Sequence, residues 1–229
     1  YREGAIESMD WIDSVTVDSS EVVRLWFVIE PFPDWSAVGH TYLTFEFVDG
    51  NNLSFSIEAR KEEGEAYSAL KGLFREYELA YTWGTERDFL TRRLLYLGND
   101  VRMYPLELEA DVVQKLFVNF VQETQSVTEK PRFYNTLTQN CTNALAHGVN
   151  ELFPNSLNYD VSWNFPGSSD IFLMEEGLIA TVGSPEDTRE ANDLTLFKKD
   201  IAELNTISHS KFSAMIREML NGEGVIVDN

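Results

Sequence analysis

Cysteine is almost absent from this chain, because Cys141 is the only one among 229 residues. A single cysteine excludes an internal disulfide and also a zinc site built from cysteines. Histidine is scarce as well, and His40, His147 and His209 do not show the spacing of metal ligands. The sequence therefore predicts no metal centre, and we expect no cofactor.

Basic side chains are few, with 18 Lys and Arg against 38 Asp and Glu and a net charge of −20 at pH 7. Repulsion from phosphate excludes nucleic acid as a partner. An anionic membrane surface would repel most of the molecule too. A lipid substrate would have to be reached through a local apolar or basic patch, or through a membrane-anchored part absent from this chain.

Long hydrophobic runs are also missing. No segment reaches the roughly 20 apolar residues of a transmembrane helix, and no signal peptide is present. The chain opens at Tyr1 without an initiator Met, which fits a processed or truncated protein. With 43% hydrophobic and 13% aromatic residues, the chain can bury one good core, or one core with an appendage.

Hydrophobic patterning predicts a mixture of strands and helices. The expected strands are 21–30, 40–48, 53–60, 78–83 and 101–106, and the expected helices are 5–14, 67–74, 85–97, 109–125, 141–152, 171–176 and 211–220. We expect the last third of the chain to be rich in loops and to wrap the core. Residues 184–193 are acidic and typical of solvated surface.

The register of one hairpin can be predicted from its two alternating runs, 40–48 and 53–60. A folded sheet must merge their apolar positions into one face, which comprises Leu43, Phe45, Phe47, Leu53, Phe55 and Ile57. Odd positions then pair with odd positions. His40 and Glu58 consequently share the opposite face of adjacent strands, so an imidazole and a carboxylate lie on one side.

Cys141 follows a polar turn and opens a helix-forming stretch. Unpaired backbone N–H groups and the positive end of the helix dipole favour a thiolate in the first turn. The neighbouring Asn140, Thr142 and Asn143 are residues that cap and hydrogen-bond rather than pack. Cys141 is therefore the best candidate for a nucleophile, while the alternative is a buried structural cysteine.

A thiol nucleophile needs a base within reach and a third group that orients the base. His40 and Glu58 can fill these roles if their face meets the start of the Cys141 helix. His147 is six positions beyond Cys141, about 120° around the same helix, and is interpreted as structural. His209 lies in a late segment and is a weaker candidate.

Other polar residues could support the site. Asn140 or Tyr134 could assist the backbone N–H of Cys141 in binding an oxyanion, although capping and packing are the simpler interpretation of both. Arg60 and Arg87 could shape a polar pocket that binds substrate, or they could form ordinary surface ion pairs.

Several segments together resemble a known family. They are Gly39-His40-Thr41-Tyr42-Leu43-Thr44-Phe45, Ser56-Ile57-Glu58-Ala59-Arg60, Thr85-Glu86-Arg87-Asp88, Pro131 to Thr142, and Pro166-Gly167-Ser168-Ser169-Asp170. In this order they resemble the landmarks of the Lnb N-terminal periplasmic domain family, and the Asn-Cys-Thr block with its preceding Phe-Tyr-Asn-Thr is the specific part.

The resemblance implies an α+β, circularly permuted papain-like fold, with an antiparallel sheet packed against helices that include the nucleophile helix. It implies Cys141 as nucleophile, His40 as base and Glu58 as orienter, in a domain exported to the periplasm. It covers roughly residues 38–180, so we expect one domain over 1–180 and a C-terminal extension, 181–229, that packs on it. The activity it implies is acyl transfer to bacterial lipoproteins.

The sequence leaves three functions open. The first is a thiol acyltransferase or acyl hydrolase that acts on lipoprotein or phospholipid acyl groups through an acyl-thioester. The second is an amidase or cysteine peptidase that acts on cell-wall peptides with the same machinery. The third is a binding module without turnover. An apolar groove beside Cys141 would favour a lipid, whereas an open polar cleft would favour a peptide.

Overall fold

The computed structural model describes residues 15–32, 35–60, 76–135, 140–154, 156–158, 160 and 163–222. Its centre is a five-stranded antiparallel sheet in the order β4-β3-β2-β1-β5. The strands are β1 (Val22–Phe32), β2 (Trp35–Phe47), β3 (Leu53–Arg60), β4 (Glu78–Thr85) and β5 (Arg102–Pro105). All five were expected from the sequence, whereas the helices expected at 5–14 and 67–74 lie outside the described residues.

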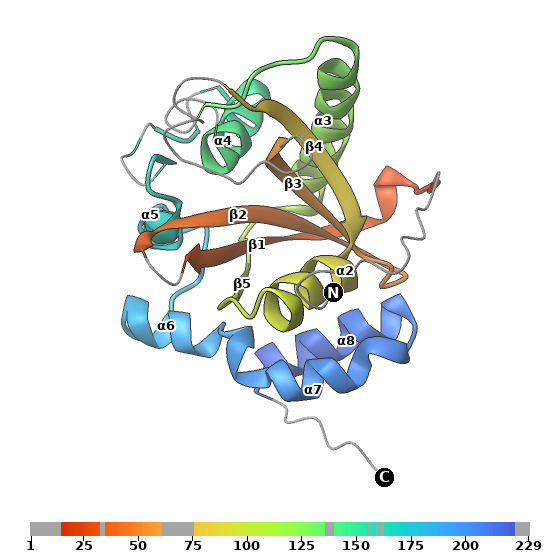
Figure 1. Cartoon of the computed structure of the whole chain (residues 1–229), viewed down its shortest axis with the longest axis vertical. Coiled ribbons are helices and arrows are strands. Elements are labelled where there is room, and N and C mark those ends of the chain that lie inside the picture. The colour runs from red at the N-terminus through yellow and green to blue at the C-terminus, as the bar shows by residue number, and fades with distance from the viewer. Residues whose placement is uncertain are drawn as a thin grey trace.

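Helices cover both faces of this sheet (Figure 1). On one side lie α3 (Ala110–Glu129), α4 (Cys141–Leu152) and α5 (Ser169–Glu175). On the other lie α2 (Glu86–Thr91), α7 (Lys198–Glu203) and α8 (His209–Leu220), with α6 (Pro185–Ala191) near the end of the sheet. The protein is therefore an α+β protein. No helix within the described ranges is long and apolar enough to cross a membrane.

Short helical segments join these elements. They are the 3-10 turns Ser19–Glu21, Pro166–Ser168, Leu194–Phe197 and Leu204–Thr206, and the π-helix Arg92–Tyr96 that continues α2. The expected helix 85–97 is thus an α-helical turn followed by a π-helical one. Thr85 caps it as predicted, because its side chain accepts a hydrogen bond from the backbone N–H of Asp88.

The hairpin register is the predicted one. Leu43 pairs with Phe55, and Tyr42 pairs with Ser56, so odd positions meet odd positions. The odd face packs under α3 and α4 in a cluster that includes Phe45, Phe55 and Phe120. Rings in this cluster meet edge-on or tilted, as between Phe45 and Phe117 at a centroid distance of 5.1 Å.

The opposite face of the sheet is buried as well. Trp26, Val28 and Tyr42 pack there against a second cluster that includes Phe212 and Ile216 of α8. The last third of the chain is less rich in loops than expected, because it supplies four helices, α5 to α8, where only two were predicted. Two of them, α6 and α7, are only seven and six residues long, too short for a periodic hydrophobic pattern to stand out.

Residues 184–193 are mostly exposed, as their acidic composition indicated, and most of them form α6. A capping box formed by Ser184 and Asp187 starts α6. From this helix Arg189 donates two hydrogen bonds of 2.8 Å to the fully buried carboxylate of Asp170. The hydroxyl of Tyr104 donates a third at 3.0 Å. These bonds attach the start of α5 to both β5 and the C-terminal segment.

One glycine allows α4 to lie close to α3. A Cβ at Gly148 would come within 2.4 Å of a ring carbon of Phe120, a distance that no packed pair of carbons adopts. The side chain of Asn119 donates a hydrogen bond to the Gly148 carbonyl across the same contact. Close helix packing here holds the nucleophile helix against the sheet.

Candidate active site

Cys141 is the first residue of α4, as the sequence predicted. Asn140 caps the helix, and its side chain accepts a hydrogen bond of 2.8 Å from the backbone N–H of Asn143. The same side chain donates to the carbonyl of Trp163 at 2.9 Å. The thiol is buried, with 4% of Cys141 exposed, and it interacts with Thr41 and His40 of β2.

His40 and Glu58 meet on neighbouring strands. The Nε2 atom of His40 lies 2.7 Å from the hydroxyl of Ser56 and 3.5 Å from Oε1 of Glu58. Ser56 donates to that same carboxylate oxygen at 3.0 Å. Because Nε2 is directed toward Ser56 and Glu58, the other ring nitrogen is available to the thiol. The three residues thus have the order of a nucleophile, a base and an orienting group.

The electrostatics of the site favour an ion pair. Burial disfavours the charged imidazole, but the negative charge of Glu58 and a hydrogen bond with Cys141 outweigh it and raise the pKa of His40 to about 10. Burial likewise opposes the thiolate, yet the hydrogen bond and charge of His40 lower the pKa of Cys141 to about 7. The pKa of Glu58 stays well below its usual range despite burial, chiefly because of the charge of His40. A thiolate and an imidazolium therefore coexist near neutral pH.

A second carboxylate lies behind Glu58, joined to it by an arginine. Arg93 is 5% exposed, and its guanidinium lies 3.2 Å from Glu58 and 3.0 Å from the buried Glu30. It also stacks over the ring of Tyr42 at 4.5 Å. The side chain of Asn99 donates to Glu30. Charge pairing on both sides fixes the guanidinium and, through it, the position of the Glu58 carboxylate.

These residues surround one cleft of about 300 Å³. Its walls include His40, Glu58 and Cys141 together with Tyr134 and Asn140. The rest of the lining is mixed, with polar side chains such as Arg92 and Asn99 beside apolar ones such as Phe32, Val38, Ile57 and Leu97. A substrate carbonyl in this cleft would lie against the first turn of α4. Among the residues that the structure describes, no group of His, Cys, Asp and Glu side chains could hold a metal ion.

Comparison with protein families matches residues 7–169 to the Lnb N-terminal periplasmic domain. The chain belongs to this family. No curated protein and no solved structure matches it. Membership of the Lnb N-terminal domain family places the protein in the periplasm. The matched region ends at Ser169, so Asp170 and the helices α6 to α8 lie beyond it.

In this Lnb N-terminal domain the structure gathers five of the seven predicted site residues at the cleft. Asn140 is engaged in capping, which supports the simpler interpretation of that side chain. Arg60 and Arg87 do not line the cleft. Arg60 pairs with Glu78 at the surface, 3.2 Å away, and Arg87 donates to the carbonyl of Ile207 at 2.6 Å and contacts His209. His147 is exposed and faces Trp163.

Sequence reasoning missed Arg93, Glu30 and the orienting contact of Ser56. The strand register could have found Glu30, since it pairs directly with His40 across β1 and β2. Arg93 could not be found in that way. It belongs to the π-helix Arg92–Tyr96, and the single extra residue per turn of a π-helix changes which side chains face the sheet.

Proposed function

We propose that this domain is a thiol acyltransferase or acyl hydrolase that works through an acyl-thioester on Cys141. The convergence of Cys141, His40 and Glu58 in one cleft carries the proposal. The shifted pKa values of the thiol and the imidazole support it, because shifts of this kind gather at functional sites. The order of the imidazole strand before the thiol helix also supports a circularly permuted papain-like fold.

The reaction follows from the ion pair. The Cys141 thiolate attacks an ester or amide carbonyl and forms a C–S bond, while the C–O or C–N bond breaks and the leaving group takes a proton from His40. An amine or water then attacks the thioester and gives its proton to the neutral His40. The C–S bond breaks, which restores the thiolate and the imidazolium. Glu58 keeps the imidazole oriented and stabilises its positive charge.

Bacterial lipoprotein or phospholipid acyl groups are the substrates we propose first, since the family resemblance implies them. A cell-wall peptide is the second candidate. The side chains of Arg92, Asn99 and Asn164 in the cleft wall offer hydrogen-bonding groups to a peptide amide.

The test is the intact mass of the protein after incubation with phospholipid or with a diacylated lipopeptide. We expect a gain of one acyl chain in the wild type, no gain in the Cys141→Ala protein, and loss of turnover in that variant. Full activity of Cys141→Ala would refute the mechanism.

A binding module without turnover predicts an ordinary thiol at Cys141. In that case iodoacetamide would react with Cys141 no faster than with free cysteine near neutral pH.

A further inference from the structure

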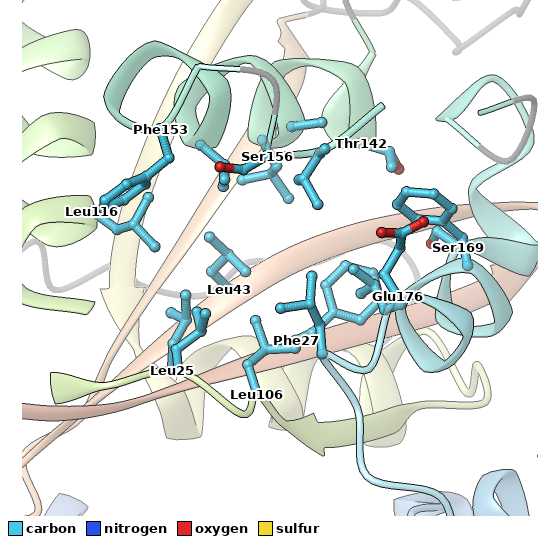
Figure 2. Close-up of a pocket in the computed structure, with 18 of the residues that line it drawn as sticks. Leu25, Phe27, Leu43, Leu106, Leu116, Thr142, Phe153, Ser156, Ser169 and Glu176 are labelled. Atoms are coloured by element: carbon cyan, nitrogen blue, oxygen red, sulfur yellow. The ribbon is translucent and has the colours of Figure 1, made fainter. Parts of the chain in front are cut away.

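A second cavity lies beside the cleft, between α4, α5 and the odd face of the sheet (Figure 2). Its volume is about 340 Å³, within the range of small-molecule binding sites, which starts at roughly 300 Å³. Leu25 and Phe27 of β1, Leu43 of β2 and Leu116 of α3 form its floor and far wall. Aliphatic and aromatic side chains make up most of the remaining surface.

The cavity offers almost nothing to a polar ligand. Only four of its side chains carry a hydroxyl or carboxylate: Thr142, Ser156, Ser169 and Glu176. The hydroxyl of Thr142 is 2.9 Å from that of Thr41, and the hydroxyl of Ser169 donates to the carbonyl of Pro166 at 2.7 Å. Ser156 and Glu176 are exposed and lie at the rim. A polar group inside would lose its hydrogen bonds to water without replacement, whereas a hydrocarbon would not.

The first turn of α4 separates this cavity from the nucleophile. Cys141 faces the cleft, and the next residue, Thr142, faces the cavity with its hydroxyl oxygen 4.0 Å from the sulfur. The chain after α4 also contributes to both spaces, since Trp163 lines the cavity and Asn164 lines the cleft. The two spaces are therefore adjacent, since neighbouring residues of the chain line them at both places.

The same helix presents a full stripe to the cavity. Thr142, Leu145, Ala146, Val149 and Phe153 all line it, at the spacing of one helical face. On the opposite face of α4, Ala144, His147 and Glu151 border a different, more polar hollow. A ligand in the cavity would therefore contact the nucleophile helix along most of its length.

We propose that this cavity binds one hydrocarbon chain of the substrate, the chain whose carbonyl carbon is attacked by Cys141. This assignment rests on the proposed function, and it makes the cavity the feature of the protein that selects the acyl donor. The carbonyl and the leaving group lie in the cleft beside Cys141, and the chain passes Thr142 and Trp163 into the cavity. The domain then prefers a long-chain acyl group over a peptidyl group as the acyl donor.

The experiment measures binding without turnover, in the full chain carrying Cys141→Ala. Nile red serves as a neutral fluorescent probe, and a series of straight-chain alcohols displaces it. Each added methylene is expected to tighten displacement by about fourfold, the factor that corresponds to burial of one methylene. The gain should stop when the cavity is full. A series with no dependence on chain length would overturn the proposal.

A matched pair of variants locates the probe. Ala146→Phe puts a ring into the cavity and should weaken Nile red binding by about tenfold or more. Glu151→Phe puts the same ring at an exposed position on the opposite face of α4 and should leave binding within about twofold of the parent. If Ala146→Phe does not fold, Val149→Phe, at a half-buried position of the same stripe, replaces it. Equal binding by the folded cavity variant and by Glu151→Phe would refute the assignment.

The two proposals can fail separately. Nile red binding that Ala146→Phe abolishes, in a protein whose wild type forms no thioester, would support the cavity as a hydrocarbon site and reject the acyl transfer mechanism. Thioester formation that is equally fast with acetyl and long-chain donors, and is unaffected by Ala146→Phe, would support the mechanism and reject the cavity as the chain site.

Discussion

The two faces of the sheet are packed in different ways. The face under α3, α4 and α5 is built from aliphatic and aromatic side chains, yet it leaves a cavity of about 340 Å³. The face under α2 and α8 has an apolar cluster too, but it also encloses ion pairs, such as that of Arg217 with the buried Glu86 at 2.8 Å. The first face therefore leaves room for a ligand, whereas buried ion pairs hold the elements of the second face in place.

The candidate site lies at the junction of these two faces. Cys141 comes from a helix of the first face, while Arg93, which holds Glu58, stacks on Tyr42 of the second. Buried ion pairs contribute little net stability, but breaking one leaves a charge without compensation. We therefore expect substitutions on the second face to affect stability and those at the junction to affect chemistry.

His40→Ala at the junction should have the largest effect. Activity should fall by about 10²- to 10⁴-fold, the usual contribution of a general base. The pKa of the Cys141 thiol should rise from about 7 toward its ordinary value, because the charge and hydrogen bond of His40 hold it down. The measurement is the pH dependence of alkylation by iodoacetamide. His147→Ala, an exposed histidine on α4, is the control and should titrate as the wild type does.

In the wild type the ion pair also sets a pH window for activity. The thiolate forms as the pH rises through about 7, and the imidazolium is lost as it rises through about 10. The rate should therefore rise through the first value and fall above the second. A flat rate across that range would contradict the assignment of the pair.

Arg217→Met tests the second face. This residue pairs with Glu86, which is 1% exposed, and contacts Glu46 at 3.2 Å. Loss of the guanidinium would leave a buried carboxylate unpaired and should lower the free energy of unfolding by about 3 kcal/mol. Urea denaturation measures this change. Arg60→Met at the exposed pair with Glu78 should stay within about 0.5 kcal/mol of the wild type.

Gly148→Ala tests the packing of the first face. The added methyl would lie 2.4 Å from a ring carbon of Phe120, so α4 must shift, at a cost of about 1–3 kcal/mol. Phe120→Leu in the same chain should recover part of the loss, because it removes the atoms that clash. A double variant as unstable as the sum of the single ones would show that Phe120 is not the cause.

The sheet and the position of the nucleophile helix could be predicted from the sequence. The run after Gly50 alternates throughout and the run before it alternates from Leu43 to Phe47, and one register alone puts these apolar residues on one face. Asn140 and Cys141 lie at a helix start that local capping chemistry specifies. Such features depend on residues that are close in the sequence, so they can be predicted without a structure.

The second sheet face and the cavity could not be predicted. Thr44 and Ser54 are buried on this face, and their hydroxyls pair with each other at 2.8 Å. The same face packs against α8, more than 150 residues further along the chain. Polar residues at alternating positions of a strand usually face solvent, so the sequence pattern did not indicate that this face of the sheet is buried. A cavity is a packing property of several elements and leaves no local pattern in any of them.

Arg93→Lys should have the smallest effect and isolates the role of the junction. Lysine keeps the positive charge but cannot contact Glu58 and Glu30 with two fixed nitrogens at once. Activity should fall by about tenfold, equivalent to one charge-assisted hydrogen bond of about 1.5 kcal/mol. Because Glu58 would no longer be held against His40, the upper limit of the pH window should move down from about 10. If Arg93 had only a structural role, the substitution would lower the stability of the protein and leave the upper limit of the pH window unchanged. An unshifted pH profile would therefore show that Arg93 does not position Glu58.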